Sequence, residues 1–290
     1  MSQLKEIEKQ LKGVGSLQDI VHSMRSLAAV NLYKTAKVLE SIRQYRRMIQ
    51  EGLGLVNHLL PPSIPEMMDK INLPAAYLIF TSDQGLSGSF NEKVIDFVQQ
   101  YDARGKEVLY MVNGVRGQDL LKESKIDTFL YTSAPTSLEG IKKAMRDLAD
   151  TLYLYYSEGR FGSLTLFYNV YVSVGQFTPT AFSVLPLDVT QLKRETSSSS
   201  QPHLYVTPEE LLPLLIEEYL FIELYRAFVE SLASENGSRL RSMDSAGKNI
   251  DKKIEELLQL YRISRQEEIT SEMLEVISGA EALIKKRTKW

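Results

Sequence analysis

The sequence of 290 residues contains no cysteine. This absence excludes disulfide bonds, thiol catalysis and thiolate metal sites, and it fits a reducing compartment. A basic surplus is absent too, since 34 Lys and Arg stand against 37 Asp and Glu. We therefore expect no nucleic acid as the main partner. With 43% hydrophobic and 24% charged residues, the chain has the composition of one or two globular domains with a sizeable core.

Histidine is scarce, and motifs for catalysis are missing. His22, His58 and His203 lie far apart without metal-ligand spacing, and no Gly-x-Ser-x-Gly elbow is present. We expect each histidine at the surface or in a packing contact. The sequence therefore predicts no catalytic residue, no bound metal and no cofactor.

Apolar runs of membrane-spanning character are lacking as well. The first residues, Met1–Glu6, carry charge and begin no apolar segment of signal-peptide length, so we expect the protein to stay in the compartment where it is made. The longest uncharged run, residues 161–187, is interrupted by Asn169, Pro179 and Pro186, and its apolar residues partly alternate. This pattern predicts two strands instead of a membrane helix.

The sequence does contain a seven-residue repeat near each end. The C-terminal series comprises Leu215, Ile222, Val229, Asn236, Met243, Ile250 and Leu257. The N-terminal series comprises Ile7, Val14, Val21, Ala28, Thr35, Ile42, Ile49 and Val56. A sustained seven-residue repeat is typical of helices that supercoil about a partner. We therefore predict that an N-terminal helix, residues 1–60, and a C-terminal helix, residues 207–288, pair as a long antiparallel two-helix coiled coil.

The C-terminal series has two irregularities. Asn236 either faces solvent where the helix leaves its partner or fixes the register of the pair. A charge run over residues 262–268 then interrupts the series, which resumes in a shifted phase at Ile269, Val276 and Leu283. This run is either a solvated face or a surface that meets an encircling partner.

Residues 74–190 alternate short apolar runs with helical patterns. Strands are predicted at 75–80, 108–112, 128–131, 164–174 and 180–187, with helices that end near 101 and 124 and a helix at 138–157. Strands that alternate with helices favour an α/β domain with some parallel pairing. The predicted fold class is therefore α/β, with a small Rossmann-like mixed sheet between the two helices of the coiled coil.

The ends of the two long helices are marked by proline and by a capping box. Pro61 and Pro62 end the first helix, and Thr207, Pro208 and Glu210 begin the second. The helices would extend roughly 80 and 110 Å, at about 1.5 Å per residue, which is more than the α/β domain can cover. Part of the hairpin must be buried by another protein or be an exposed rod.

The segment Gly85–Asn91 is a glycine-containing turn between a strand and a helix. It lacks the Lys-Ser/Thr ending of a nucleotide loop and the spacing of a dinucleotide site, so a phosphate-binding role is the lesser alternative. The preferred interpretation is a tight turn capped by Asp83 or Ser82.

Residues 269–282 (ITSEMLEVISGAEA) resemble the C-terminal signature of the gamma subunit of F-type ATP synthases. The resemblance extends over the whole chain. It includes residues 81–91, the last strands at Gln176 and 185–187, and further positions in the long helices, namely Ile20, Met24, Ala28, Ala29, Ser234, Glu235, Arg239, Met243, Asp244, Ala246, Asn249, Tyr261, Arg265 and Gln266. Gln84 departs from the family pattern, where a basic residue is usual, as do His22 and Asn31, where lysines are usual.

The resemblance implies a non-catalytic rotor subunit of a proton- or sodium-translocating ATP synthase. Such a shaft couples ion flow through the membrane c ring to ATP synthesis or hydrolysis in a ring of alpha and beta subunits, and it also contacts the epsilon subunit. The resemblance further implies a peripheral membrane protein at the cytoplasmic face of a bacterial inner membrane. By this likeness, the residues that contact the catalytic ring are Met24, Arg265, Gln266, Thr270 and Glu272, and Tyr205 is a candidate for the c-ring contact.

Two other functions remain open from the residues alone. A structural coiled-coil tether with an α/β domain would need no ATPase partner. An α/β enzyme with a helical arm would bind nucleotide in a saturable way, whereas a shaft subunit would not.

Overall fold

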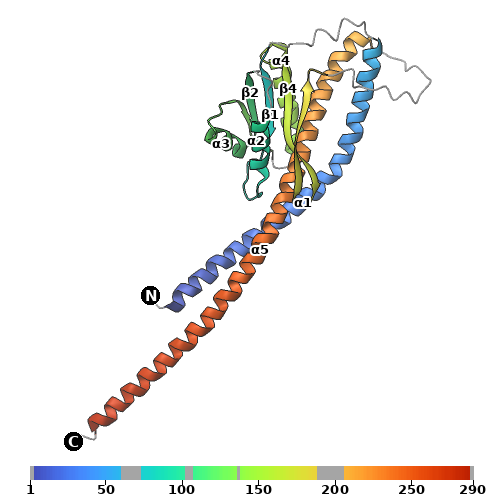
Figure 1. Cartoon of the computed structure of the whole chain (residues 1–290). Helices are drawn as coiled ribbons and strands as arrows, with labels where there is room; N and C mark the ends of the chain where they lie inside the picture. Colours follow the sequence, from blue (N-terminus) through green and yellow to red (C-terminus); the bar gives the residue numbers. More distant parts are fainter. Residues whose placement is uncertain (1–2, 60–72, 102–106, 136–137, 188–205, 288–290) are drawn as a thin grey trace. The chain divides into compact units, whose positions relative to one another are not determined.

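A computed structural model describes residues 3–59, 73–101, 107–135, 138–187 and 206–287 (Figure 1). The chain divides into two compact units. One is Leu27–Ser242, and the other combines Met1–Ser26 with Met243–Trp290. The unit Leu27–Ser242 contains the whole sheet, and the other unit contains only parts of the two long helices.

The two long helices are α1, Gln3–Leu59, and α5, Pro208–Arg287. The long C-terminal helix is thus confirmed, and it begins directly after Thr207, whose carbonyl accepts a hydrogen bond from the Leu211 amide at 3.0 Å. Pro213 lies inside α5 without ending it. No helix in the described ranges is both long enough and apolar enough to span a membrane.

Along the chain, the segment between the two long helices contains a five-stranded mixed sheet, with its strands in the order β3-β2-β1-β4-β5. Strands β1 to β4 are parallel, and β5 is antiparallel to β4, so the predicted mixed sheet is confirmed. The elements are β1 Ala75–Phe80, α2 Phe90–Gln100, β2 Val108–Asn113, α3 Val115–Glu123, β3 Thr128–Thr132, α4 Leu138–Ser157, β4 Ser163–Ser173 and β5 Gln176–Leu185. The uncharged run at 161–187 forms β4 and β5, as its alternation predicts.

Both faces of this sheet are covered, and β1 shows why its sequence is apolar throughout. Ala76, Leu78 and Phe80 belong to a core shared with α1, α4 and α5, whereas Tyr77 and Ile79 pack in a second core with α2 and α3. In Figure 1, α2 and α3 lie on one side of the strands and the first half of α5 on the other. A strand buried on both faces needs apolar residues at every position.

Within the unit that combines Met1–Ser26 with Met243–Trp290, three polar pairs join α1 to α5. Arg25 forms an ion pair with Asp244. The Gln18 amide donates to Asp251 at 2.7 Å, and the Tyr261 hydroxyl donates to Glu8 at 3.3 Å. The steps between successive pairs are equal on the two helices and opposite in direction.

Asn236 is buried in α5, with 2% of its surface exposed. Its side-chain amide donates to the Leu232 carbonyl at 2.8 Å, one turn earlier in the same helix. The interpretation that Asn236 faces solvent is therefore wrong. An amide among apolar neighbours is tolerated here because its own helix supplies an acceptor.

The last described turns of α5 are exposed, unlike the buried part around Asn236. Ile269 and Val276, where the apolar series resumes, are 49% and 72% exposed. Residues 271–280 are all exposed, as are Arg262, Arg265, Gln266 and Glu267 in the charge run. In the part of the chain that the structure describes, nothing covers this apolar series.

Candidate functional site

The turn after β1 is held by Asn91, a side chain of the helix that follows it, and by its own Asp83. The Ser82 amide donates to Asn91 Oδ1 at 3.0 Å, and Asn91 Nδ2 donates to Ser82 Oγ at 2.9 Å. The Asp83 carboxylate accepts from the Val115 amide at 2.9 Å and from the Ala134 amide at 3.2 Å. Asp83 therefore anchors the start of α3 and the loop after β3.

Neither Asp83 nor Ser82, which were predicted to cap this turn, caps the helix α2 that follows it. Ser89 occupies the N-cap position of α2 and makes no side-chain capping bond there. Asp83 reaches the next helix because the carboxyl ends of parallel strands lie side by side at one edge of the sheet. This places Asp83, after β1, next to the amides that follow β2 and β3.

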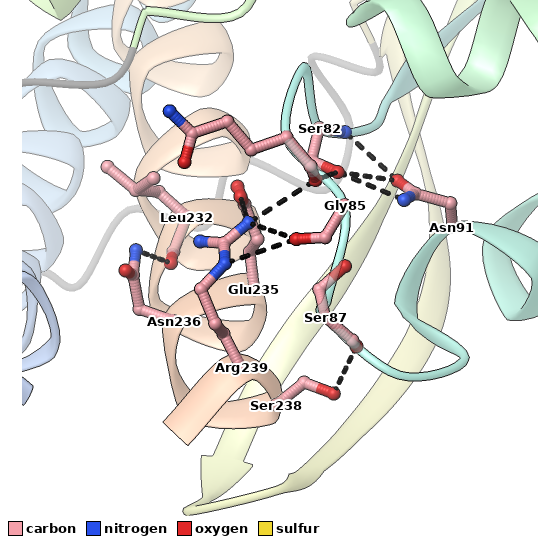
Figure 2. Close-up of polar contacts among 10 residues, drawn as sticks. Ser82, Gly85, Ser87, Asn91, Leu232, Glu235, Asn236, Ser238 and Arg239 are labelled. Carbon is pink, nitrogen blue, oxygen red and sulfur yellow. Dashed lines mark hydrogen bonds and ion pairs between the residues drawn. The ribbon is translucent and has the colours of Figure 1, made fainter. Parts of the chain in front are cut away.

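Side chains of α5 bind the backbone of the same turn, as Figure 2 shows. Arg239 Nη2 donates to the carbonyls of Gln84 and Gly85, each at 3.3 Å. Ser238 Oγ donates to the Ser87 carbonyl at 2.6 Å. We call this set of contacts the polar joint. In it, two side chains of α5 donate hydrogen bonds to three backbone carbonyls of the α/β domain.

Close approach makes glycine necessary at one position of the polar joint. Gly88 has a φ of +59°, and a Cβ there would lie 3.2 Å from Ser242 Oγ and 3.3 Å from Ser238 Oγ. The left-handed backbone strains any other common residue. Glycine at position 88 is therefore favoured by its backbone and by the closeness of α5.

The polar joint also contains a buried ion pair between Arg239 and Glu235, one helical turn apart. Burial raises the pKa of Glu235, and the charge of Asp83 adds to this effect, whereas Arg239 opposes it. Arg239 thus has two tasks, since it compensates a buried carboxylate and holds the turn.

On its other side, the turn borders a hollow of about 590 Å³ between α2 and α3. Arg116 and Lys122 line it together with Glu92, Asp119 and Glu123. Because charges of both signs are mixed there, the hollow offers no consistently positive surface to a phosphate. Among the described residues, no three His, Asp or Glu side chains come together as a metal site.

A second buried charge lies further up α5, at Glu223, whose side chain is 0% exposed. It forms an ion pair with Arg46 of α1 and accepts two hydrogen bonds from Arg226, with Nε and Nη2 each at 2.9 Å from Oε2. Both guanidinium groups lie over the Phe182 ring of β5, at 5.4 Å and 4.9 Å. Burial lowers the pKa of Arg226, but Glu223 and Tyr168 raise it more, and the net change is upward.

Sequence reasoning missed the role of Glu223, although a signal exists. Glu223 and Arg226 are the charged residues of an otherwise apolar stretch, 219–229. Charges in such a stretch are expected to pair, because an unpaired buried charge is costly. The partner on α1 cannot be found from this signal.

The residues predicted to contact a catalytic ring fall at two separate places. Arg265, Gln266, Thr270 and Glu272 are exposed on α5, and Thr270 Oγ1 donates to the Gln266 carbonyl at 2.8 Å. Met24 is half-buried on α1.

Met24 is adjacent to Arg25, whose partner Asp244 precedes Arg265 by about 30 Å of helix, at about 1.5 Å per residue. Tyr205, the candidate for the c-ring contact, lies outside the described residues.

This chain is similar to known proteins along nearly its whole length. A family model described as ATP synthase matches residues 3–283. The ATP synthase gamma chain of Moorella thermoacetica is 28% identical over 98% of this chain and 100% of its own length. That of a Methylobacterium species is 30% identical, with the same coverage.

Among solved structures, a chain of the Euglena gracilis mitochondrial ATP synthase rotor has a TM-score of 0.66 at 14% identity, covering 92% of this chain and 98% of its own. The two chains share the fold. The chain described here therefore belongs to the ATP synthase family, among its gamma chains.

Proposed function

We propose that this chain is the central-stalk rotor subunit of an F-type ATP synthase. In this role it mechanically couples ion flow through the membrane c ring to ATP synthesis or hydrolysis in the alpha/beta catalytic ring. The observation that carries the proposal is the match to gamma chains over their full length, at up to 30% identity. The chain itself would be non-catalytic, and the chemistry would belong to its partners.

In this proposal α1 and α5 form a long antiparallel two-helix coiled coil. Support comes from the equally spaced contacts of Arg25, Gln18 and Glu8 with Asp244, Asp251 and Tyr261. The buried members of the seven-residue repeats also support it, among them Ile42 and Val56 on α1 and Ile222 and Val229 on α5. Residues 1–60, 74–190 and 207–288 would then be the three working parts of the shaft.

The exposed end of α5 is the part that we propose to lie inside the ring of alpha and beta subunits. Its apolar side chains, such as Val276, lie beyond the start of α1, because the contact of Glu8 with Tyr261 places Gln3, the first residue of α1, about level with Gln266. Its charged side chains, such as Arg265, are exposed. An apolar helix face needs a partner to leave water. Arg265, Gln266, Thr270 and Glu272 would form hydrogen bonds and ion pairs with that ring, and Met24 would pack against it lower down.

The α/β domain and the adjoining ends of the long helices would face the epsilon subunit and the c ring, with Tyr205 as a contact. In this arrangement the protein is peripheral to the membrane, at the cytoplasmic face of a bacterial inner membrane. The family likeness supports these assignments, and the coupling ion would be selected by other subunits.

A tagged chain purified from its native membranes tests the proposal. We expect alpha- and beta-type subunits in excess over the tagged chain, a c ring and ATPase activity in the eluate, measured by mass spectrometry and phosphate release. Recovery of the chain alone, or with unrelated proteins and no ATPase activity, would favour a coiled-coil tether. Saturable nucleotide binding by the isolated chain, measured by calorimetry, would favour an enzyme.

A further inference from the structure

Three glutamates of α5 each bind a side chain of α1 and, directly or through a neighbour, the α/β domain. Glu218 accepts from the Tyr45 hydroxyl at 2.9 Å and from Arg146 of α4 at 3.1 Å. Glu230 accepts from Arg43 at 3.4 Å and from the backbone amide of Tyr171 in β4 at 3.3 Å. These two carboxylates lie on either side of Glu223 along α5.

Glu223 is the most buried of the three and has the most complete set of partners. Arg46 reaches it from α1, Arg226 from α5 itself, and both guanidinium groups rest on Phe182 of β5. Arg226 also lies over the Tyr168 ring of β4, at 5.4 Å. The Glu223 carboxylate therefore joins two helices, and its two arginine partners contact two strands.

Stability alone does not account for this arrangement. A buried ion pair recovers little more than the cost of removing its charges from water, so packed apolar side chains would stabilise the chain as well. What an apolar seam lacks is a fixed position along its length. Polar contacts at a helix interface specify register, because a shift of one helix leaves them unpaired.

We propose that Glu223, with Arg46 and Arg226, locks α1, α5 and the α/β domain in one register, so that torque applied to the α/β domain reaches both helices. Glu223 acts here as a positioning residue, distant from any reacting atom. This inference rests on the proposed central-stalk function. Glu218, which is partly exposed, and Glu230, whose partner Arg43 is exposed, support the same lock, and their contacts are weaker because solvent screens the exposed members.

Arg46→Gln is the variant that tests the lock. It breaks the bond from α1 but leaves Glu223 paired with Arg226, so no buried charge is left alone and the chain can fold. Arg46→Lys is the conservative variant, since its ammonium group can still pair with Glu223. Arg160→Gln is the matched control, because Arg160 pairs with Glu158 at an exposed site within the α/β domain.

The measurement is the ratio of ATP-driven ion pumping to ATP hydrolysis in membrane vesicles that carry the whole complex. We expect this ratio to fall several-fold for Arg46→Gln, to recover for Arg46→Lys and to keep the wild-type value for Arg160→Gln. A wild-type ratio for Arg46→Gln, or equal losses for all three variants, would overturn the inference. A wild-type chain that joins no ATPase complex would instead contradict the central-stalk function itself.

Discussion

Gly117 and Gly13 are glycines in helices with opposite surroundings. A Cβ at Gly117 would lie 2.4 Å from Thr81 Oγ1, whereas a Cβ at Gly13 would meet nothing within 4 Å. We expect Gly117→Ala to lower the free energy of unfolding by about 1–3 kcal/mol, because Thr81 and α3 must separate. Gly13→Ala should raise it by about 0.5–1 kcal/mol through helix propensity. Urea unfolding of both variants checks the pair, and a loss of equal size in both would contradict the packing described for Thr81.

Glu235 makes stability depend on pH in a direction that can be tested. Burial raises the pKa of Glu235 in the folded chain above its ordinary value of 4.5. At pH values between 4.5 and the folded pKa, the folded chain therefore binds more protons than the unfolded chain. Stability contributed by this group is complete below about pH 4.5 and is lost as the pH rises through the folded pKa.

Glu235→Gln removes this titration. Relative to the variant, the wild-type chain should lose stability as the pH rises above about 4.5, measured as the urea midpoint at each pH. Glu51→Gln, at an exposed site on α1, serves as the control for the change from glutamate to glutamine. An opposite trend for Glu235→Gln would mean that Arg239 outweighs burial at this carboxylate.

At the scale of elements, we expect side chains near the end of α5 to affect assembly but not folding. Arg265 and Gln266 are exposed and lie beyond the polar pairs that join α5 to α1, so Arg265→Ala and Gln266→Ala should change the free energy of unfolding by no more than about 0.5 kcal/mol. We expect both to weaken assembly with the catalytic ring or its coupling, because polar contacts to that ring are lost. Normal ATPase assembly and normal ion-driven ATP synthesis in both variants would show that these residues make no such contact.

The elements themselves could be predicted because their signals are local. The alternation of β4 and β5, the apolar run of β1 and the proline-marked ends of α1 and α5 each depend on neighbouring residues. The resemblance at residues 269–282 also gave the family, which the comparison then established independently. Long elements with a clear period are the ones for which sequence is most informative.

The contacts between elements could not be predicted in the same way. Asp83 was expected to cap α2, but it binds amides brought to it by β2 and β3. Arg46 and Glu223 are too far apart in sequence for any local pattern to pair them. Asn236 was expected either to face solvent or to fix the register of the two helices. It is buried, but its side chain bonds to its own helix. Each of these outcomes depends on the sheet order and helix register, which follow from the whole fold.

At the scale of the whole molecule, the proposed coupling depends on contacts between elements instead of on a reactive group. The polar joint at Arg239 and the lock at Glu223 both tie α5 to the α/β domain, and both are buried. A subunit that transmits rotation has to resist shear between its parts. The two buried charged sites supply contacts that a shear would break.

Rotation of this chain inside a catalytic ring tests the central claim most directly. Because the sequence has no cysteine, Lys143→Cys on the exposed side of α4 gives a single thiol for a bead. The chain is assembled with alpha and beta subunits from the same source, and the ring is fixed to a glass surface. We predict that the bead turns in one direction when ATP is added and stops when ATP is removed. A bead that stays still on rings that hydrolyse ATP would contradict the account.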